Sequence, residues 1–177
     1  MSATRQLPRM AGQLKEAQAL LEEASNLVNP SSGIANDFLN QYNEVLLLVE
    51  NLEVLIPDMV EDLLDWKPKT YREYFSYSPL PGGAMAIEIY YCLDRNFRKK
   101  FEAQIAKMNK LALKAIAVIS EQHRNSEDLK AEDVALFCKQ ISKKLRAEIE
   151  RSCMLVNHGV PVPPETLQAM ADRLMQT

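Results

Sequence analysis

Apolar residues recur at alternating spacings of four and three through most of the chain, which is the repeat of an amphipathic α-helix. The first series runs from about residue 8 to 28 and ends before Asn29-Pro30. The second series follows Ser31-Ser32 and has eight positions: Phe38, Tyr42, Val45, Val49, Leu52, Ile56, Met59 and Leu63. Pro57 lies inside this series and lacks a backbone donor, so the sequence predicts one long helix that is kinked there.

Two further helical patterns occupy the second half of the chain. The third runs from about residue 84 to 122, and its phase slips between Tyr90 and Phe97. Asp94 lies at the slip and could cap a new helix, so this segment forms either one helix with a local defect or two helices in tandem. The fourth runs from about residue 129 to 156, ends before Gly159 and buries Val134, Cys138, Ile141, Leu145, Ile149 and Cys153.

The last segment of the chain is a short amphipathic stretch behind a proline spacer. Pro161, Pro163 and Pro164 precede residues 165–175, which are too few to form a stable helix in isolation. We therefore expect this segment to dock on the bundle or on a partner. Residues 1–160 are predicted to be the helical bundle domain, and residues 161–177 the spacer and short helix.

The composition agrees with an all-α fold. The chain has 177 residues, 47% of them hydrophobic, and only five glycines, which suits one domain with a substantial core. We expect a four-helix-bundle-like domain of long antiparallel helices with an aromatic Pro/Gly connector and a short C-terminal helix. The four-and-three spacing also permits a homodimer, because an apolar seam left uncovered at the bundle edge can pack against a second copy.

Aromatic residues concentrate in the connector between the second and third patterns. Thr70 and Glu73 have the spacing of a capping box, which predicts one helical turn from Thr70 to Phe75 before Pro79. The rings of the connector either fold back to fill the end of the bundle or contact a partner. They are Trp66, Tyr71, Tyr74, Phe75 and Tyr77. Our hypothesis is that they dock a protein partner together with the C-terminal side chains Leu167, Met170 and Leu174.

Charge is unevenly distributed, although the net charge is only -3. Residues 1–65 carry three basic and eleven acidic side chains, whereas residues 66–160 carry seventeen basic and eleven acidic ones. A basic stripe lies in the third helical pattern and comprises Arg98, Lys99, Lys100, Lys107, Lys110 and Lys114. We expect this stripe to be solvated or neutralised by the acids of the second pattern, and binding to nucleic acid is the less favoured interpretation.

The residue types needed for metal or cofactor chemistry are scarce. The two histidines, His123 and His158, have no glutamate three residues before them, and no Cys-x-x-Cys or glycine-rich phosphate loop is present. We therefore expect no metal and no cofactor. Cys92, Cys138 and Cys153 are predicted to be small buried hydrophobes. The N-terminus does not resemble a secretory signal and no run of eighteen apolar residues occurs, so we expect a cytoplasmic protein without a membrane span.

Asp37 and Gln41 support the one enzymatic hypothesis. An acid and an amide four residues apart on a helix can position a water molecule against an acyl phosphate. This pair resembles the short Asp-x-x-x-Gln element of chemotaxis response-regulator phosphatases, which are also helical bundles; the resemblance spans five residues. Our main expectation is a non-catalytic protein-interaction or regulatory module. The alternative that the resemblance implies is a small regulatory phosphatase or adaptor of two-component signalling.

Overall fold

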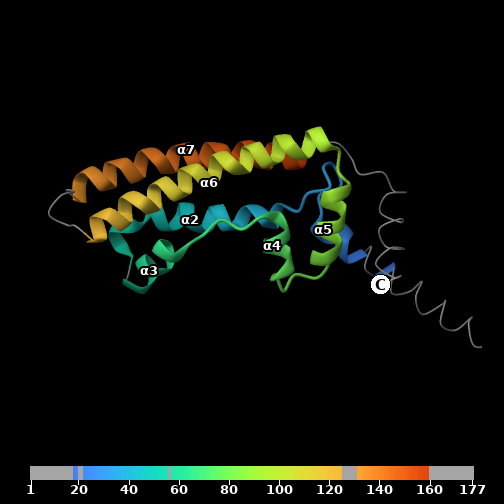
Figure 1. The fold of residues 1–177 in the computed structure, drawn as a ribbon, viewed down its shortest axis with the longest axis horizontal. Helices are drawn as coiled ribbons and strands as arrows, with labels where there is room; N and C mark the ends of the chain where they lie inside the picture. Colours follow the sequence, from blue (N-terminus) through green and yellow to red (C-terminus); the bar gives the residue numbers. More distant parts are fainter. Residues whose placement is uncertain (1–17, 20–21, 56, 125–130, 160–177) are drawn as a thin grey trace, which may run out of the picture. The chain divides into compact units, whose positions relative to one another are not determined.

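The computed structural model describes residues 18–19, 22–55, 57–124 and 131–159. These residues are mostly helical, which confirms the all-α prediction (Figure 1). Within the predicted first helix, residues 18–19 and 22–27 are helical, and residues 8–17 and 20–21 lie outside the described residues, as do Leu167, Met170 and Leu174. The labelled elements are the 3₁₀ turns η1 (Asn36–Leu39) and η2 (Leu52–Val54) and the helices α2 (Asn40–Glu50), α3 (Pro57–Asp65), α4 (Tyr71–Ser76), α5 (Gly83–Cys92), α6 (Arg95–Arg124) and α7 (Ala131–Asn157).

The chain divides into two compact units. Unit 1 comprises Met1–Phe38, Thr70–Arg98 and Leu155–Thr177, and unit 2 comprises Leu39–Lys69 and Lys99–Met154. Helices α6 and α7 each contribute most of their length to unit 2. Both units are therefore assembled from segments that are distant in the sequence.

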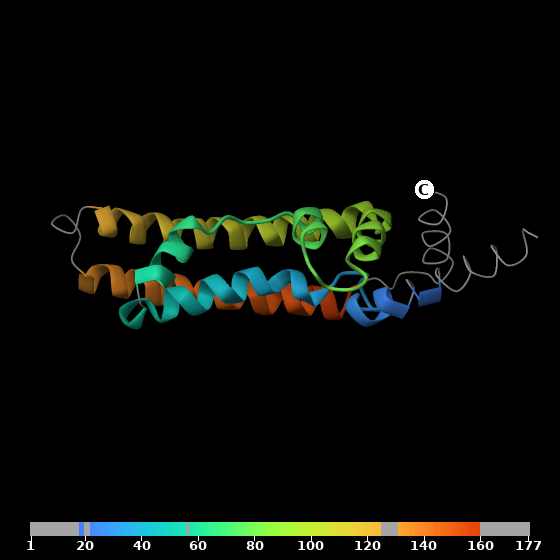
Figure 2. The same ribbon diagram turned by 90° about the horizontal axis from the view of Figure 1, so that it is seen from below.

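Unit 2 is built on α2, α6 and α7, which run side by side (Figures 1 and 2). Gln104 of α6 donates to the backbone carbonyl of Glu148 on α7 at 3.1 Å, and Lys114 lies over the ring of Phe137, so these two helices are antiparallel. The hydroxyl of Tyr42 donates to Asn109 at 2.6 Å and ties α2 to α6. The apolar core of this unit includes Val45, Val49, Leu63, Phe101, Met108, Ala112, Ile119, Val134, Cys138, Ile141, Leu145 and Ile149.

The second helical pattern does not form the single kinked helix that we predicted. α2 ends at Glu50, and both the N–H and the side-chain amide of Asn51 bond to the carbonyl of Leu47. The turn η2 follows, and Pro57 then stands at the first position of α3. A proline costs little there because the first N–H groups of a helix have no intrahelical acceptor. Pro57 thus starts a new helix instead of kinking an old one.

The third helical pattern forms two helices, which decides between the two alternatives. α5 ends at Cys92 and α6 begins at Arg95. A carboxylate oxygen of Asp94 accepts from the N–H of Asn96 at 3.0 Å and from the N–H of Phe97 at 2.9 Å. Asp94 therefore caps α6 in the way that its position at the phase slip suggested.

Unit 1 contains the part of the connector from Thr70 onward, and its predicted capping box is confirmed. Thr70 accepts from the N–H of Glu73 at 3.2 Å, and Glu73 accepts from the N–H of Thr70 at 2.8 Å. The backbone hydrogen bond from Thr70 lowers the pKa of Glu73 because it favours the carboxylate. The core of this unit is formed by Ala24, Val28, Ile34, Ala35, Phe38, Tyr71, Phe75, Met85, Ala86, Ile89, Tyr90, Phe97 and Val156.

Candidate functional site

Two of the five connector rings belong to the core of unit 1. Tyr71 is 4% exposed and Phe75 is 3% exposed. The ring of Tyr71 stacks on Tyr90 with 4.4 Å between centroids, and its hydroxyl accepts from the N–H of Ala35 at 2.9 Å. Burial raises the pKa of Tyr71 because it disfavours the phenolate. These two rings hold α4 to the rest of the unit and do not present a surface to a partner.

The other three connector rings are more accessible. Trp66 is half-buried in unit 2 and meets the ring of Tyr42 edge-on at 6.1 Å. Tyr74 is half-buried in unit 1 and meets Phe38 edge-on at 5.6 Å. Tyr77 follows α4 and is 84% exposed. The connector therefore offers one fully accessible ring instead of a continuous aromatic patch.

Gln41, the amide of the enzymatic hypothesis, is buried in unit 2 with 4% exposure. Its side-chain oxygen accepts from the N–H of Lys69 at 2.9 Å, and its side-chain nitrogen donates to the carbonyl of Lys69 at 3.3 Å. Both ends of the amide thus hold the segment before α4 against α2. Asp37 is half-buried in η1. The amide group of Gln41 therefore takes part in the packing of unit 2 at both of its ends.

We expect the substitution Gln41→Ala to lower the free energy of unfolding by about 1–3 kcal/mol, because it leaves the backbone groups of Lys69 without their partners. Urea unfolding followed by circular dichroism measures this change. Gln140→Ala is the control, since Gln140 is exposed on α7 and its replacement should cost less than about 0.5 kcal/mol. Equal stability of the two variants would contradict a structural role for Gln41.

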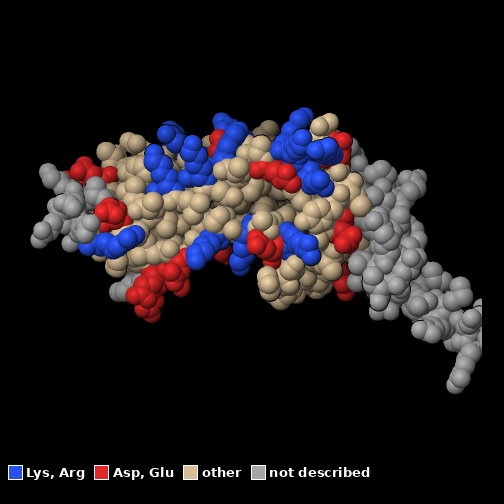
Figure 3. All heavy atoms as spheres, viewed as in Figure 1, with Lys and Arg blue, Asp and Glu red and all other residues tan. Residues whose placement is uncertain are grey.

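The exposed lysines of the basic stripe lie along α6. Lys107, Lys110 and Lys114 are exposed, and the ammonium of Lys114 lies 5.6 Å from the ring centroid of Phe137. On one face of the molecule many basic side chains lie over α6 and α7, and a group of acidic ones lies over α3 (Figure 3). Among the described residues, no ion pair joins the acids of α2 or α3 to Lys107, Lys110 or Lys114. Glu50 of α2 instead pairs with Arg146 of α7 at 2.7 Å.

The three cysteines differ in their surroundings. Cys138 is buried as predicted, Cys153 is half-buried, and Cys92 is exposed at the end of α5, so the prediction is wrong for Cys92. Cys92 is the last residue of α5 and follows the exposed Tyr91, so its position differs from those of Ile89 and Tyr90, which face the core. Burial raises the pKa of the Cys138 thiol to about 11. This thiol is therefore protonated at neutral pH and is a weak nucleophile.

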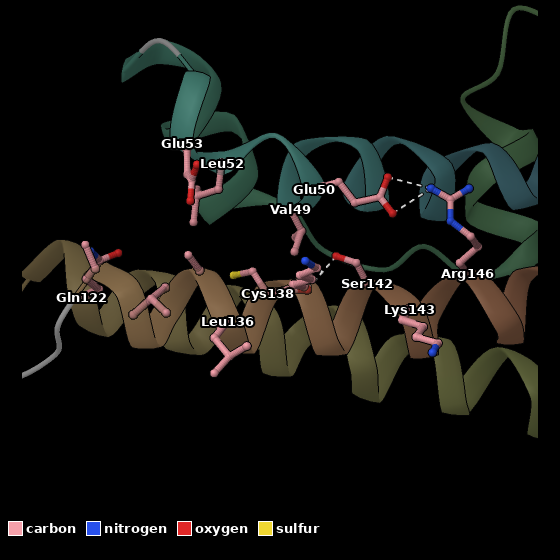
Figure 4. Close-up of a pocket in the computed structure, with 14 residues that line it drawn as sticks. Val49, Glu50, Leu52, Glu53, Gln122, Leu136, Cys138, Ser142, Lys143 and Arg146 are labelled. Atoms are coloured by element: carbon pink, nitrogen blue, oxygen red, sulfur yellow. Dashed lines mark hydrogen bonds and ion pairs between the residues drawn. The ribbon is translucent and has the colours of Figure 1, made fainter.

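A groove in unit 2 is the feature that sequence reasoning missed. It has a volume of about 670 Å³ and lies between the end of α2 with η2 and one face of α7 (Figure 4). Its lining residues are Val49, Glu50, Leu52 and Glu53 from the first side, Gln122 from α6, and Ala131, Val134, Ala135, Leu136, Cys138, Lys139, Ser142, Lys143 and Arg146 from α7. The groove exists because α2 stops at Glu50. A signal for it was present in Asn51 and Pro57, which end one helix and start the next.

The groove has an apolar floor and charged walls. Val49 and Cys138 point into the space between α2 and α7, and Val134 is also buried there (Figure 4). Ala131 and Ala135 are small, which keeps the first turns of α7 open to a neighbour. The hydroxyl of Ser142 donates to the carbonyl of Cys138 at 2.7 Å. An apolar floor with a polar rim suits the recognition of an amphipathic segment.

Catalytic chemistry finds little support in this groove. The Ser142 hydroxyl is engaged with the backbone, and the Cys138 thiol has no histidine beside it among the lining residues. Within the described ranges, no three His, Cys, Asp or Glu side chains gather in a geometry that could hold a metal ion. None of the helices in the described part of the chain is both long and apolar enough to cross a membrane.

Comparison of the chain with protein-family models, with curated proteins and with solved structures gave no match.

Proposed function

We propose that this chain is a non-catalytic protein-interaction module that docks an amphipathic helix of a partner protein in the groove of unit 2. One observation carries the proposal: the face of α7 from Ala131 to Arg146 lines an open groove because α2 ends at Glu50. That face is about 22 Å long at 1.5 Å per residue. It accommodates a helix of about four turns, which is a common length for a recognition helix.

The partner helix would complete a four-helix arrangement. α2, α6 and α7 supply three helices, and the bound helix would lie where the sequence pattern placed the second half of the predicted long helix. The small side chains of Ala131 and Ala135 allow its backbone to approach α7 closely. Apolar side chains of the partner would then cover the accessible apolar surface of Leu52, Ala131 and Ala135, and this burial would be the main source of binding free energy.

The groove replaces the aromatic connector as our proposed docking site. Tyr71 and Phe75 are core residues, so of the connector rings Tyr77 has the largest exposed surface. A regulatory role in the cytoplasm suits a module that binds a helix and carries out no reaction of its own. The phosphatase alternative loses its main support because the Gln41 amide is buried and bonded to Lys69.

A displayed library of 15-residue helical peptides tests this function. Each peptide has leucines on one face, and its flanking positions are drawn from Glu, Lys, Gln and Ala. We expect the full chain to enrich peptides that Ala135→Trp no longer binds, because the indole fills the groove. Gln140→Trp is the matched control, since Gln140 is exposed on the same helix outside the groove, and it should retain binding.

Two results would overturn the proposal. Binding of the enriched peptides to Ala135→Trp and to the unaltered chain with equal affinity would show that they do not use the groove. The oligomeric state provides the second result. A homodimer seen by sedimentation and dissociated by Ala135→Trp, but not by Gln140→Trp, would assign the groove to a second copy of this chain instead of a partner protein.

A further inference from the structure

We infer that the helix bound in the groove carries acidic side chains along one flank and basic side chains along the other. This inference rests on the proposed function and concerns the chemistry of the partner. It follows from the two walls of the groove, which carry opposite charges. Glu53 stands on the η2 side, and Lys139 and Lys143 stand on the α7 side.

The charged side chains of the walls are available to a ligand. Glu53, Lys139 and Lys143 are all exposed, and none of them forms an ion pair with a described residue. Lys139 and Lys143 are four residues apart on α7 and so lie one turn apart on the same face. Both belong to the α7 edge of the groove, where Lys143 extends along the side of α7 that points away from α2 (Figure 4), and Glu53 belongs to the η2 edge.

Glu50 and Arg146 contribute less to the choice between helices that carry different charges. The Nη2 atom of Arg146 lies 2.7 Å from both carboxylate oxygens of Glu50. The two charges neutralise each other across the groove and connect α2 to α7. They therefore mark one end of the groove, and the selection of charged flanks falls to the remaining three side chains.

The number of favourable charge contacts ranks three kinds of helix. A helix with one acidic and one basic flank can meet all three wall charges favourably. A helix with two acidic flanks meets Lys139 and Lys143 favourably and Glu53 unfavourably, and a helix with two basic flanks does the reverse. Exchanging the acidic and basic flanks changes little, because turning the helix end to end restores the match. The charges thus select a mixed helix and set its direction in the groove.

Three synthetic 15-residue peptides test this ranking. They share one leucine face and have mixed, all-Glu or all-Lys flanks, and circular dichroism confirms that their helix contents match. Fluorescence anisotropy with the full chain at low salt should show the mixed peptide binding about threefold more tightly than the all-Glu peptide and about tenfold more tightly than the all-Lys peptide. Raising the salt to about 0.5 M should shrink both ratios, because the contacts lie at the surface.

The substitution Glu53→Lys gives the decisive comparison, because it makes both walls basic. The all-Glu peptide should then bind more tightly than the mixed one. Glu61→Lys is the control: Glu61 is exposed on α3, does not line the groove, and changes the net charge equally. An equal switch in Glu61→Lys, or equal affinities of the three peptides for the unaltered chain, would overturn the inference while leaving the docking site intact. Failure of all three peptides to bind the unaltered chain would instead count against the proposed function.

Discussion

Replacing Tyr71 with alanine will lower the free energy of unfolding by about 3–5 kcal/mol, the range measured for large buried aromatic residues. Tyr71 is packed against Phe38, Phe75 and Tyr90, with ring centroids 5.2, 4.8 and 4.4 Å away. Alanine would leave a cavity among these rings and would also remove the acceptor for the N–H of Ala35. The cavity and the lost hydrogen bond both lie in the core of unit 1, so we expect the whole unit to be destabilised.

Tyr71→Phe separates the ring from its hydroxyl. The phenylalanine keeps the ring contacts and removes the acceptor for the buried N–H of Ala35, so we expect a loss of about 1–3 kcal/mol. Tyr77→Ala is the control from the same connector and should change stability by less than about 0.5 kcal/mol, because Tyr77 is exposed. Urea unfolding monitored by circular dichroism measures all three. A Tyr71→Ala variant as stable as Tyr77→Ala would show that the connector does not contribute to the core.

Gly82→Ala is the second substitution for which we expect a large effect, a loss of about 2–4 kcal/mol. Gly82 precedes α5 with a φ of +82°, a left-handed conformation that costs other residues free energy. A Cβ atom there would also lie 2.9 Å from the carbonyl carbon and oxygen of Glu23. These are backbone atoms of a helical segment, so they cannot move aside as the tip of a flexible side chain could.

Gly82→Asn separates the two causes of this loss. Asparagine tolerates the left-handed conformation better than alanine does, but it carries the same Cβ atom. We therefore expect Gly82→Asn to remain clearly destabilised, because its contact with Glu23 is retained. Thermal unfolding of both variants measures the difference. An asparagine variant as stable as the unaltered chain would show that the approach to Glu23 is not limiting and that the loss in Gly82→Ala comes from the backbone angle alone.

Local features of the structure were predictable because their interactions span only a few residues. The hydrogen bonds between Thr70 and Glu73 and the cap that Asp94 provides to Phe97 join residues three apart. Helical periodicity likewise identified the inward-facing positions of α7, such as Cys138. A pattern that repeats every turn reports which side of a helix is apolar, whatever covers that side.

The break after α2 was harder to predict because periodicity does not detect it. The apolar spacing continues past Glu50 to Leu63, and Leu63 is indeed buried, although in a different helix. The 3₁₀ turn between the two helices keeps the apolar residues near the core while it changes the direction of the chain. A continuous pattern is therefore compatible with one helix or with two. The groove of unit 2 forms when the pattern gives two helices instead of one.

The sequence alone determined where helices can form, how they are capped and which of their faces are apolar, since these properties arise from neighbours within one or two turns. Only the tertiary structure decided which segments meet. It placed Lys69 against the Gln41 amide, Ala35 against the Tyr71 hydroxyl and Glu53 opposite Lys139. Such pairs are separated by 28 residues or more, and their formation depends on how the whole chain packs. For that reason the core role of the connector and the charged groove became visible only in the folded molecule.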